Sequence, residues 1–218
     1  VWELEADEFV GTVAVPQSII RKGGTYRARV RMRNGTMAWS HWSPPVEFVA
    51  GEPDLAGLRA GLAFNEIMYN PLGQAGVSAG EFEFLEFKNI GESTLDLSGL
   101  FFSSGISFIF PEGSMLASGE LFLLGINRAA LQSRYPGLVV NGIFEGKLAN
   151  EGEAITLSAG IGAPVLSVVY DDAAPWPEQA DGQGFSLAAD RESDLGFRVS
   201  VISSGSPGSD NPGLFKPV

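Results

Sequence analysis

Short apolar runs separated by turn-forming residues recur along most of the chain. Runs of this length and spacing predict the strands of an all-β sandwich. One helix is expected among them at residues 127–134, because Asn127 is a good N-cap and Pro136 and Gly137 would end it. The predicted strands lie at residues 62–69, 82–90, 95–103, 106–110, 120–125, 138–144, 153–158, 164–170 and 184–189.

The run at residues 81–87 departs from strict alternation. Its apolar phase slips between Phe84 and Leu85, so no single register buries Phe82, Phe84, Leu85 and Phe87 together. The slip predicts either a bulge or a strand that is covered on both faces.

Residues 25–33 alternate between apolar and polar side chains, which predicts a strand. One face carries Arg27, Arg29, Arg31 and Arg33, and the other face is expected to point into a core. Asn34-Gly35 predicts a turn, and the apolar run 46–49 that follows would complete a hairpin. The residues expected to face the core are Tyr26, Ala28, Val30 and Met32.

Turn-forming residues at 51–54 mark a change in amino-acid composition, because phenylalanine becomes common and arginine rare after them. This change predicts two domains. The first covers residues 1–50, a linker covers 51–57, the second domain covers 58–212, and 213–218 form a tail. The stretch after Ser203 is rich in Gly, Ser, Pro and Asp, which predicts a loosely held terminus.

Composition fits a folded chain with room for two small domains. Of the 218 residues, 44% are hydrophobic and 18% are charged. The net charge of -12 disfavours binding to nucleic acid. There is no cysteine for a disulfide or a thiolate metal site, and no apolar run is long enough to predict membrane insertion. The first residues lack the features of a signal peptide, so an export signal is expected upstream.

Tyr26 to Val49 resemble the last two strands of a fibronectin type III domain. Trp39-Ser40-His41-Trp42-Ser43 matches the tryptophan–serine repeat that such domains carry in cytokine receptors. Two indoles three residues apart on an extended backbone can hold guanidinium groups between them, and each cation–π contact contributes about 0.5–2 kcal/mol. Arg29 and Arg31 are the predicted cations, with Arg27 or Arg33 as alternatives. The resemblance implies a mainly structural ladder.

A complete fibronectin type III domain has seven strands in about 90–100 residues. Residues 1–50 match only its C-terminal strands, so the sequence predicts a partial domain. Either the rest of the domain lies outside this sequence, or packing on the next domain or on a neighbouring chain replaces the missing sheet.

The second region resembles a bacterial lamin tail domain, an immunoglobulin-like β-sandwich. The likeness implies interaction rather than catalysis, within a larger secreted or surface bacterial protein. A nuclear filament role does not carry over, because the filament rod is absent. The matching segments are Asn65 to Pro71, Glu83 to Asn89, Leu95 to Leu100, Phe110 to Gly113, Asp181-Gly182, Gly184 to Leu187 and Gly205 to Gly208.

Catalytic motifs are missing from the sequence. The single histidine, His41, lies between the two tryptophans of the repeat, and there is neither a G-x-S-x-G elbow nor a Gly-rich phosphate loop. The sequence therefore predicts that the chain is not an enzyme.

Carboxylates offer the main alternative chemistry. Asp171 and Asp172 follow a predicted strand, Asp181 lies across a Pro-Trp-Pro loop, and Glu66 and Glu86 lie in or beside strands. Such oxygen clusters could hold calcium, the one cofactor considered, although no EF-hand spacing is present and solvated acids are the competing interpretation. Two carboxylates could also serve a glycosidase if a cleft held them at the required separation.

Trp176, between two prolines, completes a candidate ligand loop with Asp171, Asp172 and Asp181. It would either contact a sugar or protein partner or fold back over the end of the sandwich. Taken together, the sequence predicts a non-catalytic binding, adhesion or scaffolding module at the bacterial cell surface, with a protein or glycan partner. The alternatives are a calcium-assisted carbohydrate-binding module and a spacer that positions a neighbouring enzyme.

Overall fold

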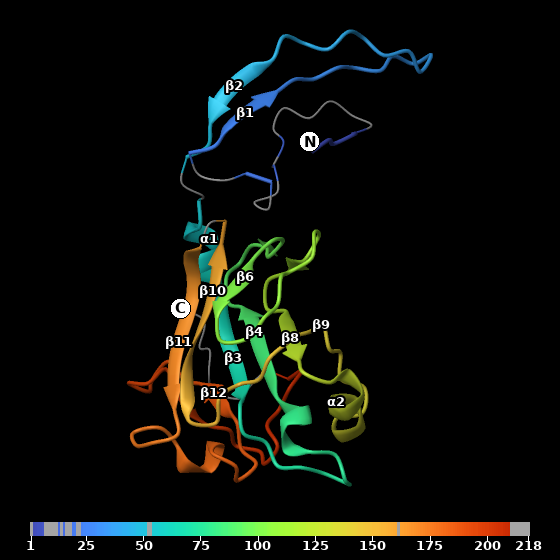
Figure 1. Cartoon of the computed structure of the whole chain (residues 1–218). Coiled ribbons are helices and arrows are strands. Elements are labelled where there is room, and N and C mark those ends of the chain that lie inside the picture. The colour runs from blue at the N-terminus through green and yellow to red at the C-terminus, as the bar shows by residue number, and fades with distance from the viewer. Residues whose placement is uncertain are drawn as a thin grey trace.

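The structure is a computed structural model that describes residues 2–6, 13, 15, 19–20, 23–51, 54–160 and 162–209 (Figure 1). Strands dominate this part of the chain, together with two short α-helices and two short 3₁₀ turns, which confirms the all-β prediction. The elements are β1 (Thr25–Ala28), β2 (Val46–Val49), α1 (Ala56–Gly61), β3 (Leu62–Met68), η1 (Ala79–Phe82), β4 (Phe84–Asn89), β5 (Leu95–Asp96), β6 (Phe101–Ser104), β7 (Met115–Leu116), β8 (Leu121–Gly125), α2 (Arg128–Arg134), β9 (Gly142–Ile143), β10 (Gly152–Ala159), β11 (Ala163–Asp171), η2 (Glu178–Ala180), β12 (Leu187–Ala189) and β13 (Phe197–Val199).

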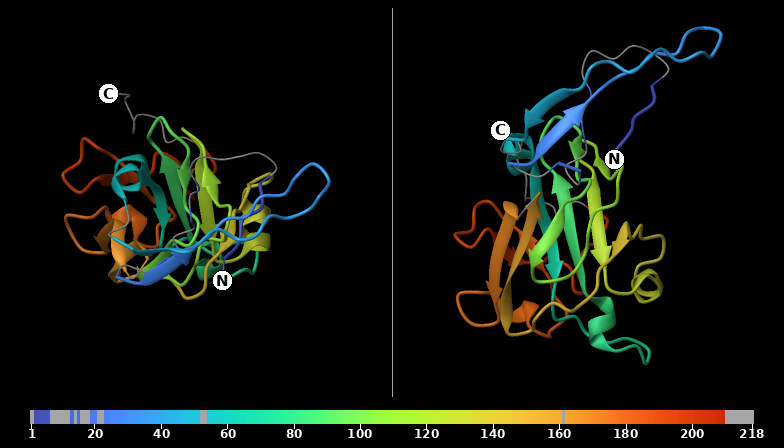
Figure 2. Two further views of the ribbon diagram at one scale, coloured as in Figure 1. Left: turned by 90° about the horizontal axis from the view of Figure 1, so that it is seen from above. Right: turned by 45° about the horizontal axis from the view of Figure 1, so that its top comes forward.

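Two sheets form the body of the protein (Figures 1 and 2). The larger sheet has six strands in the order β13-β12-β3-β4-β8-β9, and only the β8–β9 pair is parallel. The smaller sheet has the order β11-β10-β6 and is antiparallel. The short strands β5 and β7 pair with each other.

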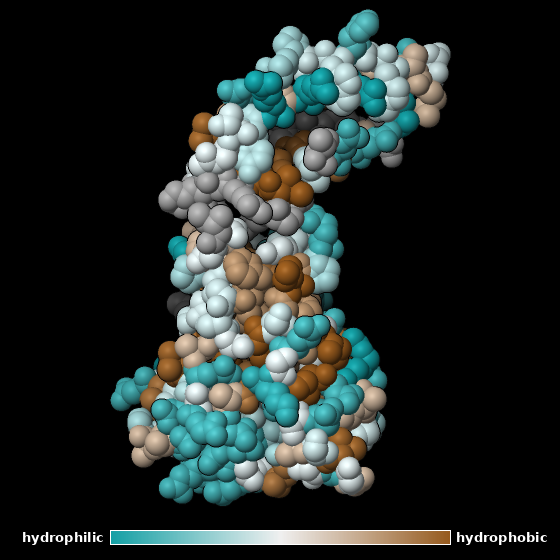
Figure 3. All heavy atoms as spheres, viewed as in Figure 1, coloured by the Kyte–Doolittle hydropathy of each residue, from teal (hydrophilic) through white to brown (hydrophobic). Residues whose placement is uncertain are grey.

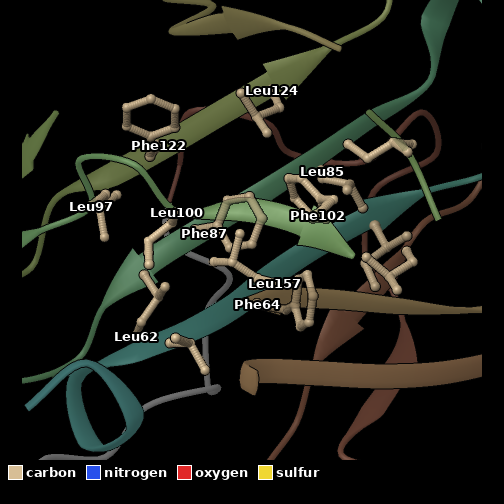
Figure 4. Close-up of a cluster of buried hydrophobic side chains, with 14 of the residues drawn as sticks. Leu62, Phe64, Leu85, Phe87, Leu97, Leu100, Phe102, Phe122, Leu124 and Leu157 are labelled. Carbon is tan, nitrogen blue, oxygen red and sulfur yellow. The ribbon is translucent and has the colours of Figure 1, made fainter. Parts of the chain in front are cut away.

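A continuous apolar core fills the space between the two sheets. Figure 4 shows Phe64, Leu85 and Phe87 of the larger sheet near Phe102 and Leu157 of the smaller one. The ring centroids of Phe64 and Phe87 are 5.2 Å apart, and those of Phe87 and Phe102 are 6.2 Å apart. These contacts make the body a β-sandwich.

Strand β4 is buried on both faces, which is the second of the two outcomes predicted from its phase slip. Leu85 and Phe87 belong to the core between the sheets, whereas Phe84 packs on the outer face with Leu123 and with Leu131 of α2. Because α2 covers this outer face, the apolar side chains on both faces of β4 are packed against other apolar residues.

Helix α2 forms where the sequence predicts it. The Oδ1 atom of Asn127 accepts a hydrogen bond from the Ala130 amide at 3.1 Å, which caps the N-terminus. Helix α1 was not predicted and begins inside the expected linker. Leu58 of α1 is buried in the core, and the Arg59 side chain donates to the Pro164 carbonyl at 2.8 and 3.0 Å.

Several short strands differ from the prediction. Residues 106–110 form only two isolated bridges, from Ile109 to Phe101 of β6 and from Ser107 to Glu145, and the run 138–144 contributes only β9. Strands β7 and β13 fall where no strand was expected. These pieces have two or three residues, too few to show a period in the sequence.

Strands β1 and β2 pair as an antiparallel hairpin that projects beyond the α1 end of the sandwich (Figures 1 and 2). The prediction that one face of residues 25–33 points into a core is wrong. Val30 and Met32 are 63% and 66% exposed. Among the described residues β1 and β2 form a sheet of their own, so no second layer covers that face. Figure 3 shows hydrophobic atoms of this projecting part that are uncovered in that view.

The prediction of a loose terminus is wrong for residues 204–209. Gly205 and Pro207 are buried. The Ser206 amide donates to the Glu66 carboxylate at 2.9 and 3.2 Å, and the Gly208 amide donates to Glu86 at 2.5 Å. We call these contacts the carboxylate clasp. The predicted tail 213–218 and the end of the second domain, 210–212, lie outside the described residues.

Candidate functional site

The arginine–tryptophan ladder lies on one face of the hairpin. The Arg31 guanidinium lies between the two indoles, 4.3 Å from the ring centroid of Trp39 and 4.5 Å from that of Trp42. Arg29 lies 4.9 Å from Trp42, and Arg33 lies 5.2 Å from Trp39. The order along the column is therefore Arg29, Trp42, Arg31, Trp39, Arg33.

Hydrogen bonds from two serines hold this part of the hairpin together. The Oγ atoms of Ser40 and Ser43 each accept a hydrogen bond at 3.0 Å, from the amides of Met32 and Val30 respectively. The backbone amides of the same two serines donate in return to the carbonyls of Met32 and Val30, both at 2.8 Å.

Arg27 remains outside the ladder. Its Nε lies 2.9 Å from Glu47 on the opposite strand. Arg33 also pairs with Glu5 at 3.0 Å, so a residue of the N-terminal segment contacts the ladder. Both ion pairs are solvent-exposed and contribute little to stability.

The face opposite the ladder is apolar and uncovered. We call it the hairpin face and define it as Tyr26, Val30, Met32, Val46 and Phe48. The rings of Tyr26 and Phe48 stack at 5.8 Å between centroids, and Val46 is 66% exposed. Exposed apolar residues gathered on one side of an isolated hairpin are typical of an interaction surface.

His41 and the acids of the predicted ligand loop lie far apart in the structure. His41 is exposed on the hairpin, whereas the acids of loop 171–184 lie at the opposite end of the sandwich (Figure 1).

The acids of the predicted ligand loop lie near one another at the end of β11. Hydrogen bonds from the Ala173 amide and from Asp172 lower the pKa of Asp171, whereas the hydrogen bond shared with Asp171 raises the pKa of Asp172. Asp181 accepts a hydrogen bond from Asn70 Nδ2 at 2.7 Å. Within the described ranges, no group of three or more acidic or histidine side chains is arranged to hold a metal ion.

Trp176 folds back over the end of the sandwich, the second of its two predicted placements. Its ring centroid lies 6.1 Å from that of Phe197, and it packs against the main core. The indole is half-buried, so only part of it is available at the surface.

Glu66 and Glu86 face each other directly across β3 and β4, and both are fully buried. Besides the clasp, Glu66 accepts hydrogen bonds from the hydroxyls of Ser186 and Ser206, and Glu86 accepts one from Asn65. These bonds give the two carboxylates a structural role, because they fix residues 205–208 across the outer face of the larger sheet.

A cavity of about 350 Å³ opens at the end of the sandwich away from the hairpin. We call it the Tyr69 cleft. Three segments line it: the residues after β3, the region of η1, and the loop between β9 and β10. The lining residues are Tyr69, Asn70, Pro71, Ala79, Gly80, Glu83, Lys147, Leu148, Ala149, Asn150 and Glu151.

Glu83 and Tyr69 are the buried polar groups of the cleft. Burial raises the pKa of Glu83 to about 7, against the opposing effect of a 2.8 Å hydrogen bond from the Leu148 amide. Burial, followed by the charges of Asp181, Asp172 and Asp171, raises the pKa of Tyr69 to about 12. The Tyr69 hydroxyl is buried and has no hydrogen-bond partner.

This cleft was not predicted from the sequence. One signal was present: Glu83 stands between Phe82 and Phe84, in a run for which cover on both faces was one of the two predicted outcomes, and such cover limits the solvation of its carboxylate. Nothing in the sequence linked it to Lys147 or Tyr69, which come from other segments.

No helix among the described residues is both long and apolar enough to cross a membrane. Comparison of the sequence with protein-family models and with curated proteins gives no match.

Proposed function

We propose that the chain is a non-catalytic binding and scaffolding module of a larger exported bacterial protein, and that it engages a protein partner through the hairpin. In this proposal the hairpin is the C-terminal part of a fibronectin type III-like domain, and the sandwich is an immunoglobulin-like domain of the lamin tail type. The two facing sheets and the core between them are compatible with that assignment. Two of its signature segments occupy the paired strands β3 and β4.

The observation that carries the proposal is the uncovered hairpin face. A two-stranded hairpin is marginally stable in water, because it has no second layer on which to bury its apolar side. Val30, Met32 and Val46 are each more than 60% exposed, at 63%, 66% and 66%. A partner that covers them removes this apolar area from water.

The ladder on the opposite face keeps the hairpin ordered for binding. Three arginines and two indoles interleave there, and stacked planar groups restrict each other's rotamers. A surface that is already ordered loses less conformational entropy when a partner binds.

An acidic, extended protein segment fits this surface best. Within the described part of the chain, β1 and β2 each have one edge that no further strand pairs with, and a peptide strand can supply the missing backbone hydrogen bonds. Residues 23–51 hold four arginines and one glutamate, whereas the whole chain has a net charge of -12. The hairpin is thus a basic element on an acidic protein, and an acidic segment is attracted to it.

The test is NMR titration of the chain with two alternating peptides, acetyl-Glu-Val-Glu-Val-Glu-Val-Glu-amide and its Lys-Val counterpart. We expect the acidic peptide to shift the amides of residues 25–33 and 43–49, and the basic peptide to have no effect. Met32→Glu should remove the shifts. Val169→Glu is the matched control. Val169 and Met32 are almost equally exposed, at 67% and 66%, but Val169 lies on the sandwich rather than on the hairpin. Equal responses to both peptides, or shifts confined to the sandwich, would contradict the proposal.

A further inference from the structure

The Tyr69 cleft contains two oxygen atoms, Glu83 Oε1 and the Tyr69 hydroxyl, for which the described residues show no hydrogen-bond partner. The Oε2 atom of Glu83 accepts the Leu148 amide, whereas Oε1 has no hydrogen-bond partner among the described residues. Tyr69 is 1% exposed, and its hydroxyl has no partner either. A buried polar atom without a hydrogen bond costs about 1–3 kcal/mol, and this cost applies to the Tyr69 hydroxyl, which a ligand in the cavity would relieve.

The charges around the cleft favour a cation. Glu81 of η1 and Glu153 of β10 face Glu83, together with the Tyr170 hydroxyl of β11, and Lys147 is the cation that opposes them. Tyr69 faces the acids of the neighbouring loop, Asp171, Asp172 and Asp181. This excess of negative groups attracts positive ligands.

The geometry favours an ammonium group over a metal ion. No group of three or more acidic or histidine side chains among the described residues is arranged to hold a metal ion, whereas divalent metals need several oxygen ligands. An ammonium group brings three N–H donors, which suit two acceptors: the Glu83 carboxylate oxygen and the Tyr69 hydroxyl oxygen, for which the described residues show no hydrogen-bond partner. The volume of about 350 Å³ also leaves room for the carbon chain of an organic cation.

We propose that the Tyr69 cleft binds a primary ammonium group, carried either by a free small amine or by a lysine side chain of a peptide. Glu83 forms the charged hydrogen bond, and the Tyr69 hydroxyl accepts a second one. This site is separate from the hairpin face, and each proposal can fail without the other.

Gly80 keeps the Glu83 oxygen open. A Cβ atom added at Gly80 would lie 3.1 Å from Glu83 Oε1 and 3.9 Å from Lys147 Nζ. Lys147 therefore already holds an ammonium near the same oxygen and competes with the ligand. Gly80→Ala should block the site, and Lys147→Met should tighten binding several-fold.

The pH dependence has a definite sign. Glu83 must be ionised to bind a cation, and its pKa is raised to about 7 by burial. Binding should therefore strengthen as the pH rises from 6 to 8, with release of a proton at the lower pH. Glu83→Gln should remove this dependence along with the affinity.

The experiment is titration calorimetry at pH 6 and pH 8 with three probes: 1,4-diaminobutane, Nα-acetyl-lysine amide and 1,4-butanediol. We expect at least one amine to bind at pH 8 and the diol not to bind. Tighter binding of the diamine indicates a free amine as ligand, and tighter binding of the lysine derivative indicates a peptide. Failure of both amines to bind at pH 8, or equal binding of the diol, would overturn the proposal.

The variants separate binding from folding. Glu83→Gln, Tyr69→Phe and Gly80→Ala should each weaken amine binding, Glu83→Gln by about tenfold or more, as expected for loss of a charged hydrogen bond. Gly57→Ala in α1 is the matched control for Gly80→Ala, because a Cβ there meets no atom within 4 Å. Tyr69→Phe should keep its melting temperature, since the lost hydroxyl has no partner. Amine affinity that survives Glu83→Gln with a normal melting temperature would also refute the site.

Discussion

The carboxylate clasp predicts that Gly205 is irreplaceable for a reason that goes beyond its backbone conformation. Its φ is +75°, and a Cβ atom there would lie 2.3 Å from Glu66 Oε1 and 3.0 Å from the Ser186 hydroxyl. Alanine at such a φ costs about 1–2 kcal/mol in any position. At Gly205 it must also displace a buried carboxylate that holds residue 206 in place.

The matched control is Gly113→Ala. Gly113 has a φ of +82°, and a Cβ atom there meets nothing within 4 Å, so only the conformational cost applies. Displacing Glu66 weakens its bonds to the Ser206 amide and the Ser186 hydroxyl, and each lost bond costs about 1–3 kcal/mol. We therefore expect Gly205→Ala to destabilise the protein by about 2–4 kcal/mol more than Gly113→Ala.

Urea unfolding followed by tryptophan fluorescence measures this difference, and thermal melting gives a second reading. At this chain length each kcal/mol lowers the melting temperature by about 2–4 °C, so the gap between the two variants should be about 4–16 °C. Equal losses in the two variants would show that Glu66 does not hold the 205–208 segment. Ser206→Ala is the substitute test if Gly205→Ala does not fold. It removes one hydroxyl donor to Glu66, keeps the backbone conformation, and should lower the free energy of unfolding by about 1 kcal/mol.

Three further predictions concern other parts of the chain. Trp42→Ala removes contacts to Arg29 and Arg31, so amide exchange in the hairpin should accelerate while the melting temperature of the sandwich stays unchanged. The raised pKa of Glu83, about 7 in the folded state, means that the free energy of unfolding decreases as the pH rises from about 4.5 to about 7. Glu83→Gln should flatten this slope in urea unfolding across that range. Asn127→Ala removes the cap of α2 and should lower the free energy of unfolding by about 1 kcal/mol in the same assay. An unchanged free energy of unfolding would show that the Asn127 side chain does not stabilise the helix.

Local pattern was sufficient to predict the long strands and α2. In β10 and β11 the turn formers around residue 160 separate two runs of eight and nine residues that pair with each other. Each of these elements carries its own period or cap, and β10 and β11 are also neighbours in sequence. The slip in β4 predicted either a bulge or cover on both faces, because two adjacent large residues of one strand cannot share a face, and the structure shows the cover.

Features that depend on distant segments were not predictable in the same way. Alternation in residues 25–33 correctly indicates a strand, but alternation cannot say whether a second layer exists, and the hairpin face is uncovered. The Gly-, Ser- and Pro-rich composition near residue 205 suggested a loose end, yet its amides bind carboxylates that lie 140 and 122 residues away in sequence. Local composition contains no information about hydrogen-bond partners that lie so far away in sequence.

The buried acids show why carboxylate counting misleads in this protein. Glu66 and Glu86 have backbone and side-chain donors within reach, so their burial serves the fold. Glu83 is buried beside the same sheet with one carboxylate oxygen bonded to an amide, and it lines a cavity together with the unpartnered Tyr69 hydroxyl. The difference between a structural and a binding carboxylate thus lies in the donors supplied by segments far away in sequence. If Glu83→Gln stabilises the protein at pH 8 and abolishes amine binding, the result would show that Glu83 serves ligand binding although it destabilises the fold.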